Sequence, residues 1–224
     1  MRHGKTGRKL GRTGSHRRAM LSPALANKGM PLAEARFIAT DLVIGGMLLA
    51  SIVGFLFEGQ PATWSALTKR FRLQRMDRRV WLWTIGGLLV LVLLSIFATI
   101  VIPLIYQAIG FTPPVDTAEP FGATAIPLAL FSLLVNILGE EFWWRGYILP
   151  RQELQLGRYT WLAHGILWAW FHIFKWWTLP ALMITCLVVP YVAQKTKNTY
   201  SGILLHLLVN GLGMGITIIQ LLTH

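Results

Sequence analysis

Residues 139–146 read Gly-Glu-Glu-Phe-Trp-Trp-Arg-Gly, and they place two adjacent carboxylates and a guanidinium at the end of an apolar run. The carboxylates belong to Glu140 and Glu141, and the guanidinium belongs to Arg145. The preceding run, 123–138, contains no ionisable residue. A charge at the centre of a membrane helix costs about 2.5 kcal/mol or more. Two adjacent acids in this setting therefore indicate a functional site whose partners lie elsewhere in the chain.

Two histidines in later apolar segments each have a conspicuous neighbour one helical turn away. Trp168 precedes His172 by four residues, and Asn210 follows His206 by four. Residues four apart share one face of a helix. At the rise of an α-helix, Glu140, His172 and His206 are expected about 15, 20 and 9 Å from the ends of their segments that are predicted to be cytoplasmic. These side chains are therefore predicted to converge near the middle of a membrane.

Three short motifs resemble, in order and spacing, the signatures of the CAAX-protease and bacteriocin-processing family of intramembrane peptidases. The motifs are Glu140-Glu141-x-x-x-Arg145, Trp168-x-x-x-His172 and His206-x-x-x-Asn210. The resemblance extends over about 123–222, nearly half of the chain. It implies hydrolysis of peptide bonds inside the bilayer. The family's second signature usually opens with phenylalanine, so Trp168 is expected to change the shape of the pocket rather than its chemistry.

Peptide hydrolysis needs an activated water, a polarised carbonyl and a proton for the leaving amine. A carboxylate in an apolar pocket is a stronger base than one in water, which makes Glu140 the candidate base. Glu141 and Arg145 are four apart in the favourable order for a helical pair, and their pairing leaves Glu140 free. His206 and Asn210 can donate hydrogen bonds to the developing oxyanion.

The resemblance adds expectations for the remaining site residues. His172 would share the water with Glu140. Three tryptophans are expected to line the pocket: Trp143, Trp144 and Trp168. Glu140, His172 and His206 could also form an open zinc site, but the sequence lacks a His-Glu-x-x-His element and its acids and histidines come from separate segments. We therefore expect a water activated by glutamate with no required cofactor, and zinc remains the alternative.

Composition and hydropathy predict an all-α, polytopic transmembrane helical bundle. The chain has 224 residues, of which 54% are hydrophobic and 13% are charged, whereas a soluble domain carries about 25% charged residues. The single cysteine excludes an internal disulfide. Pairs of glycines at 45–46 and 86–87, and three glycines within 211–215, are expected to permit close helix packing. The six predicted membrane segments are 37–57, 80–106, 123–149, 159–174, 176–193 and 200–222.

The distribution of basic residues predicts partners and orientation. The net charge is +12, but the bases lie mostly at the N-terminus and in the loop 69–79, so anionic lipid is expected as a partner and nucleic acid is not. The basic loops 69–79, 151–158 and 195–197 fall on one side if the segments alternate. The loop 110–122 has acids and no bases. The positive-inside rule therefore places the three basic loops in the cytoplasm of an integral membrane protein.

Residues 1–20 form a basic leader that resembles the start of a protein of the bacterial large ribosomal subunit. Three interpretations remain open: a misplaced gene start or fusion scar, a basic arm that contacts RNA or acidic lipid, and a disordered leader. The expected organisation is a leader over 1–36, disordered or not native, and a transmembrane peptidase-like domain over 37–224. The leader also hints at a bacterial cell membrane as the location.

The function predicted from these features is an intramembrane endopeptidase that acts on a peptide or a membrane protein. The competing hypothesis is a catalytically inactive membrane scaffold or bacteriocin-immunity protein of the same fold. In that case the acids would be a structural ion cluster, and His206 with Asn210 would join helices. A weaker alternative is an RNA-associated protein, based on the leader. His164 is expected at the membrane interface. Substrate identity and oligomeric state stay open.

Overall fold

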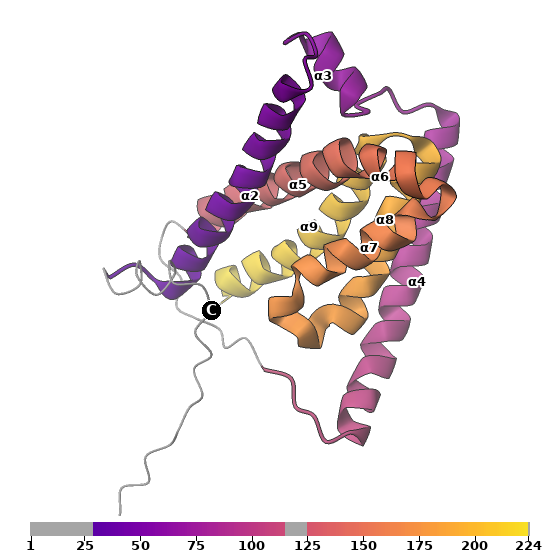
Figure 1. Ribbon diagram of the computed structural model, residues 1–224. Helices are drawn as coiled ribbons and strands as arrows, with labels where there is room; N and C mark the ends of the chain where they lie inside the picture. Colours follow the sequence, from indigo (N-terminus) through magenta and orange to yellow (C-terminus); the bar gives the residue numbers. More distant parts are fainter. Residues whose placement is uncertain (1–28, 115–124, 224) are drawn as a thin grey trace, which may run out of the picture.

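The computed structural model describes residues 29–114 and 125–223, and within these ranges the secondary structure is helical with no strands (Figure 1). The predicted all-α fold is therefore confirmed. The elements are α2 (Leu32–Phe57), α3 (Trp64–Arg70), α4 (Arg78–Ala108), α5 (Ala125–Glu141), the π-helix η1 (Phe142–Ile148), α6 (Leu149–Leu156), the 3-10 helix η2 (Gly157–Tyr159), α7 (Thr160–Phe171), the 3-10 helix η3 (Ile173–Thr178), α8 (Leu179–Thr196) and α9 (Thr199–Thr223).

The described part of the chain has five helical stretches that are long and apolar enough to cross a membrane, rather than the expected six. The difference arises at the predicted segment 159–174. Its helix, α7, has only 12 residues, or about 18 Å of rise, which is less than the roughly 30 Å thickness of the hydrocarbon core. The five stretches are Leu32–Phe57, Arg78–Ala108, Ala125–Phe171, Ile173–Thr196 and Thr199–Ile216.

The boundaries of the first segment also differ from the expectation. The helix α2 begins at Leu32, five residues before the predicted start at 37. The leader proposed over residues 1–20 lies outside the described residues. The first helix therefore includes Glu34 and Arg36 in its opening turns.

The helices pack in a row that places α9 in the interior. The helix α2 packs against α5, α5 against α9, α9 against α8, and α8 against both α4 and α7. Figure 1 shows α2 and α4 on opposite sides of the molecule with α7, α8 and α9 between them. This order brings the acids at the end of α5 next to α9, which carries His206 and Asn210.

Most of the close helix contacts at glycines occur at positions that were not predicted. A Cβ atom on Gly139 would lie 2.6 Å from the backbone oxygen of Ile44, and one on Gly165 would lie 2.4 Å from that of Cys186. The pairs α2–α5 and α7–α8 therefore approach backbone to backbone. Among the described residues, a Cβ atom on Gly87 would lie 2.6 Å from Val192, which confirms the prediction there, whereas a Cβ on Gly45, Gly46, Gly86, Gly211, Gly213 or Gly215 would meet no neighbour within 4 Å, so the prediction is wrong for these six.

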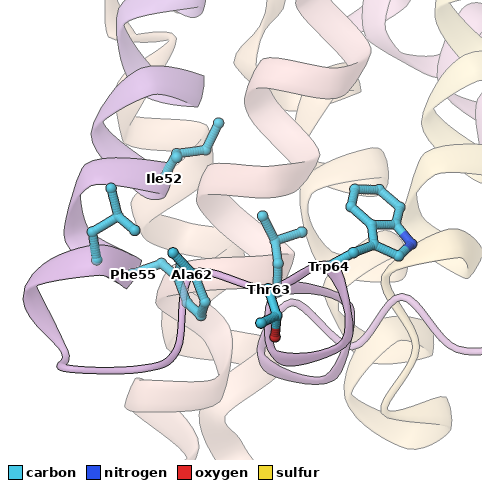
Figure 2. Close-up of a pocket in the computed structure, with 7 residues that line it drawn as sticks. Ile52, Phe55, Ala62, Thr63 and Trp64 are labelled. Atoms are coloured by element: carbon cyan, nitrogen blue, oxygen red, sulfur yellow. The ribbon is translucent and has the colours of Figure 1, made fainter.

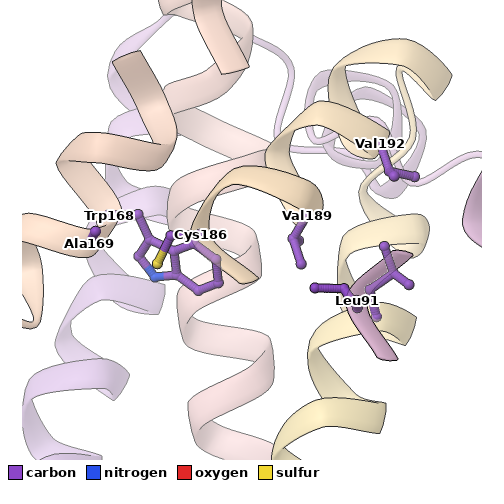
Figure 3. Close-up of a cluster of buried hydrophobic side chains, with 7 residues drawn as sticks. Leu91, Trp168, Ala169, Cys186, Val189 and Val192 are labelled. Carbon is purple, nitrogen blue, oxygen red and sulfur yellow. The ribbon is translucent and has the colours of Figure 1, made fainter. Parts of the chain in front are cut away.

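The apolar core lies where α7, α8 and α9 meet α4 (Figure 3). Trp168 is the largest of its side chains and is 1% exposed. The outward face of α4, by contrast, carries many exposed leucines, isoleucines and valines, as expected of a helix that faces lipid. The core consists of Leu91, Trp168, Ala169, Cys186, Val189, Val192 and Leu205.

The three basic loops contact one another at one end of the bundle, as their predicted common side requires. The carboxylate of Glu153 accepts two hydrogen bonds from Arg72, at 3.0 and 2.8 Å, and one from Lys197. The Asn198 side chain donates to the backbone oxygen of Gln74 at 2.8 Å. Glu153 therefore joins the loop before α4 to the junction between α8 and α9.

Candidate active site

The two acids at the end of α5 are directed to different partners. The carboxylate of Glu140, only 2% exposed, accepts a hydrogen bond at Oε2 from Trp168 Nε1 at 2.6 Å. Its other oxygen, Oε1, accepts a hydrogen bond from Asn136 Nδ2 at 2.9 Å. Asn136 lies one turn before Glu140 on the same helix, so both residues are on the same face of α5. Glu140 is therefore held by one donor from its own helix and one from α7.

Asn136 also contacts α9. Its Oδ1 atom accepts a hydrogen bond from Asn210 Nδ2 at 2.9 Å. The same Asn210 nitrogen lies 3.0 Å from His206 Nε2, to which it donates. Asn210 and His206 are one turn apart on α9, so the predicted pair does share a helix face. The two asparagine amides thereby connect Glu140 to the imidazole of His206.

Glu141 completes the connection from the opposite side. Its Oε1 atom accepts a hydrogen bond from His206 Nδ1 at 2.9 Å and lies 3.1 Å from Arg145 Nη1. The guanidinium carbon of Arg145 lies 3.5 Å from the ring centroid of Trp168. The contacts return in this way to the indole that binds Glu140. We call this closed set of seven side chains the polar ring: Asn136, Glu140, Glu141, Arg145, Trp168, His206 and Asn210.

The charges of the polar ring do not cancel when both acids are ionised. Arg145 forms its direct ion pair with Glu141, and both side chains are fully buried. Within the part of the chain that the structure describes, the hydrogen-bond donors to Glu140 are both neutral, the indole of Trp168 and the amide of Asn136. Buried charges normally survive by pairing. The predicted pairing of Glu141 with Arg145 is therefore confirmed, and Glu140 is the acid of the two that lies outside this ion pair.

Local backbone structure explains how the acids reach α9. The π-helix η1 follows Glu141 directly, and Arg145 within it still faces Glu141. Short π-helical stretches inside α-helices are frequent at functional sites. On α9, a Cβ atom at Gly202 would lie 2.3 Å from Glu141 Oε2. Only a glycine at this position lets α9 approach the carboxylate closely enough for His206 to bind it.

His172 lies beside the polar ring rather than in it. The residue ends α7, and its Nδ1 donates a hydrogen bond to the backbone oxygen of Trp168 at 2.9 Å. Its imidazole lies 6.1 Å from the ring of Trp168, centroid to centroid. The centroid distance from Trp168 to His206 is 5.3 Å. Trp168 is therefore in contact with both histidines and with the candidate base.

The other predicted aromatic residues have different surroundings. Trp143 stacks on Tyr147 with 5.7 Å between ring centroids. Trp144 packs edge-on against His164 and Phe171. His164, which was expected at the membrane interface, is fully buried among the helices, and its depth in the membrane stays a prediction. Its Nδ1 lies 2.6 Å from Oε1 of Gln152, a half-buried side chain next to the basic loop 151–158.

Asn136 is the member of the polar ring that sequence reasoning missed. Asn136 carries a neutral amide, so it does not stand out as an ionisable residue within the apolar run 123–138. Its position four residues before Glu140 was the available signal, because a polar residue there must share the face of the acid. Asn136 contacts both Glu140 and Asn210, so it joins α5 to α9.

The atoms proposed as alternative zinc ligands are already engaged. Within residues 29–114 and 125–223, no group of three or more histidine, cysteine, aspartate and glutamate side chains is placed to hold a metal ion. Both oxygens of Glu140 and both nitrogens of His206 have protein partners. An open zinc site needs three converging ligands. Glu140, His172 and His206 do not fit one in this arrangement.

The fold and the polar ring define the class: an integral, polytopic α-helical membrane protein with a glutamate–histidine–asparagine cluster buried among its helices. Residues 122–212 match the family described as type II CAAX prenyl endopeptidase Rce1-like. The match covers less than half of the chain but includes every member of the polar ring, and it confirms the resemblance inferred from the three motifs. No curated protein and no solved structure matches the chain.

Proposed function

We propose that the chain is an intramembrane endopeptidase of the CAAX-protease-like family and that Glu140 activates the attacking water. The observation that carries this proposal is the state of Glu140: a buried carboxylate held by Trp168 and Asn136 without a direct cationic partner. Its placement among helices that can span a membrane favours a substrate that is itself embedded in lipid. The substrate class is therefore a hydrophobic peptide or a membrane-protein segment.

The chemistry requires Glu140 to accept a proton from water. An ionised carboxylate offers about four acceptor positions, and Trp168 and Asn136 use two of them. The water oxygen would then bond to the carbonyl carbon, the carbon–nitrogen bond would break, and the proton would pass to the leaving amine. General base catalysis of this kind contributes typically 10²–10⁴-fold to the rate. His172 would hold the same water from the α7 side.

The remaining ring members would support the transition state. Glu141 and Arg145 hold the Nδ1 side of His206. Asn210 would donate to the developing oxyanion, and His206 would do so once its Nε2 carries a proton. At rest the Asn210 nitrogen has two acceptors, Asn136 Oδ1 and His206 Nε2. A substrate carbonyl would therefore have to replace one of these acceptors when it binds.

A catalytically inactive scaffold or bacteriocin-immunity protein is the second candidate. The feature that favours it is closure: each ring member already has a partner within the ring. Such a cluster could serve only to join α5, α7 and α9. Polar side chains stabilise helix association in membranes by about 0.6 kcal/mol on average. This function needs no reactive Glu140.

Anionic lipid is the proposed membrane partner at the end where the basic loops meet. Lys69, Arg75, Arg78 and Arg79 are exposed there. Figure 2 shows Trp64 beside a cavity of about 190 Å³ between the end of α2 and α3, and this indole is 73% exposed. Tryptophan and basic residues both favour the headgroup region. We place this face in the cytoplasm of a bacterial cell.

Cleavage in isotopically labelled water tests the proposed reaction. Purified chain in lipid nanodiscs would be incubated in H₂¹⁸O with two probes, a farnesylated CAAX-type peptide and a hydrophobic transmembrane peptide. Mass spectrometry should find one ¹⁸O atom in the new carboxylate of at least one probe, and Glu140→Gln should abolish the product. Equal product with wild type and Glu140→Gln would contradict the assignment of Glu140. No product from either probe, with an unchanged cellular phenotype in Glu140→Gln, would favour the scaffold.

A further inference from the structure

The two asparagines of the polar ring form a directional link between Glu140 and His206. A carboxylate has no proton to donate, so the hydrogen bond between Glu140 and Asn136 must come from the amide nitrogen of Asn136. The oxygen of the same amide then faces Asn210, and an oxygen can only accept there. The ionised state of Glu140 thus fixes which way the Asn136 amide points.

The same reasoning extends to the imidazole. Asn210 must present its nitrogen to Asn136, and this nitrogen also lies 3.0 Å from His206 Nε2. Its two hydrogens serve these two bonds, so Nε2 must accept. The proton of a neutral imidazole is then on Nδ1, where Glu141 accepts it. Each hydrogen bond in the series Glu140–Asn136–Asn210–His206–Glu141 therefore has a defined donor and a defined acceptor.

We propose that Asn136 is a positioning residue that, through Asn210, keeps the Nε2 atom of His206 unprotonated while Glu140 is ionised. His206 consequently presents a proton acceptor at Nε2 in the resting protein. It becomes a donor at that atom only after taking up a proton and reversing the asparagine pair. The coupling follows from hydrogen-bond direction and holds whether or not the chain is a peptidase.

Replacement of Glu140 by glutamine is predicted to exchange donor and acceptor in the hydrogen bonds that join position 140 to His206. The indole of Trp168 can only donate, so it retains the oxygen of the introduced amide and turns the new nitrogen toward Asn136. Asn136 must then offer its oxygen to the glutamine and its nitrogen to Asn210. Asn210 consequently presents oxygen to His206, and Nε2 must carry a proton. Because Nδ1 still donates to Glu141, His206 then takes up a proton from solvent and becomes an imidazolium.

A purely electrostatic effect of Glu140 would change the protonation of His206 Nε2 in the opposite direction. A negative Glu140 attracts a protonated imidazole, so its neutralisation should make Nε2 harder to protonate. Two other charged ring members bear on His206: Glu141 from α5 accepts its Nδ1 proton, and Arg145 from η1 pairs with Glu141. Neither of them changes in Glu140→Gln. The direction of the Nε2 response therefore separates the link through Asn136 from a charge effect.

A double substitution should restore the original donors and acceptors of the hydrogen bonds between Asn210 and His206. In Glu140→Gln/Asn136→Asp the carboxylate moves to position 136, where it accepts from the introduced glutamine on one side and from Asn210 on the other. The net charge equals that of the wild type. Each hydrogen bond of the ring again has a donor and an acceptor, so Nε2 should return to the unprotonated state.

The test is ¹⁵N NMR of the full chain labelled at histidine and embedded in lipid nanodiscs. The His206 signals are assigned as those lost in His206→Gln, and His164, bound to Gln152, is the internal reference. The ¹⁵N shift of Nε2 should be that of an unprotonated nitrogen in the wild type, of a protonated one in Glu140→Gln, and of an unprotonated one in the double variant.

The proposal is overturned if Nε2 has the same state in the wild type and in Glu140→Gln, or if the double variant fails to reverse the change. If Glu140→Gln does not fold, the proposal is tested by comparing the melting temperature and the Nε2 protonation of the wild type and the double variant. A double variant with a wild-type melting temperature and an unprotonated Nε2 supports the link. One that is no more stable than Glu140→Gln, or that has a protonated Nε2, refutes it.

Discussion

The indole nitrogen of Trp168 donates a hydrogen bond to the Oε2 atom of Glu140 across 2.6 Å. The family signature that this chain resembles usually has phenylalanine at the position of Trp168, and phenylalanine has no donor. The expectation that the substitution changes only the shape of the pocket therefore needs correction. In this chain the tryptophan contacts the candidate base directly and also packs against Arg145.

Trp168→Phe should lower kcat/KM about tenfold or more. Hydrogen bonds to charged groups contribute about 1.5–3 kcal/mol, and each 1.36 kcal/mol corresponds to roughly a factor of ten. The matched control is Trp161→Phe, because Trp161 is also on α7 and packs edge-on against Tyr191, outside the polar ring. Kinetics and thermal unfolding of both variants should show a loss of activity in Trp168→Phe alone, and a larger loss of stability in Trp168→Phe, whose side chain is fully buried. Equal activities would show that the donor is dispensable.

Gly202→Ala should displace Glu141 from its partners. The added Cβ would lie 2.3 Å from Glu141 Oε2, and overpacking of this kind costs typically 1–3 kcal/mol. Gly211→Ala is the control on the same helix, since a Cβ there has no neighbour within 4 Å. Thermal unfolding in detergent should show a lower Tm for Gly202→Ala and little change for Gly211→Ala. Small and equal changes in Tm for Gly202→Ala and Gly211→Ala would show that Glu141 does not contact α9 at Gly202.

Glu153→Gln should loosen the end of the bundle where the basic loops meet. The substitution removes the charge that binds Arg72 and Lys197, and the side chain is only 9% exposed. We expect trypsin to cut after Lys195 and Lys197 several-fold faster than in the wild type, because local opening of this junction becomes easier. Glu58→Gln, which affects the pair with Arg70 and Arg151, should leave these two sites unchanged. Unchanged cleavage in Glu153→Gln would show that this junction is held without the carboxylate.

Contacts within one helix could be predicted from the sequence, and those between helices could not. The pairing of Glu141 with Arg145 and the shared face of His206 and Asn210 follow from the helical period. The bond from Asn136 to Asn210 joins residues 74 positions apart. It depends on how α5 and α9 rotate toward each other, and residue spacing contains no such information.

The position of His172 shows a second limit. The predicted depth of His172 in the membrane follows from its distance along an apolar segment, and this assumes that the segment is one continuous helix. The chain instead ends α7 at Phe171 and turns through η3, so His172 lies at a bend and binds the backbone of Trp168. The π-helix after Glu141 also has no signature in the sequence. Both features are set by packing of neighbouring helices.

The most direct test of the central claim is the rate of peptide cleavage by purified Glu140→Gln. The wild type, Glu140→Gln and the exposed-carboxylate control Glu58→Gln would be compared in nanodiscs, on whichever probe peptide the wild type cleaves. Loss of the general base predicts a fall in kcat of about 10² or more, with a folded protein by circular dichroism and with Glu58→Gln near the wild-type rate. A Glu140→Gln protein that cleaves at the wild-type rate would contradict the claim that this buried carboxylate activates water.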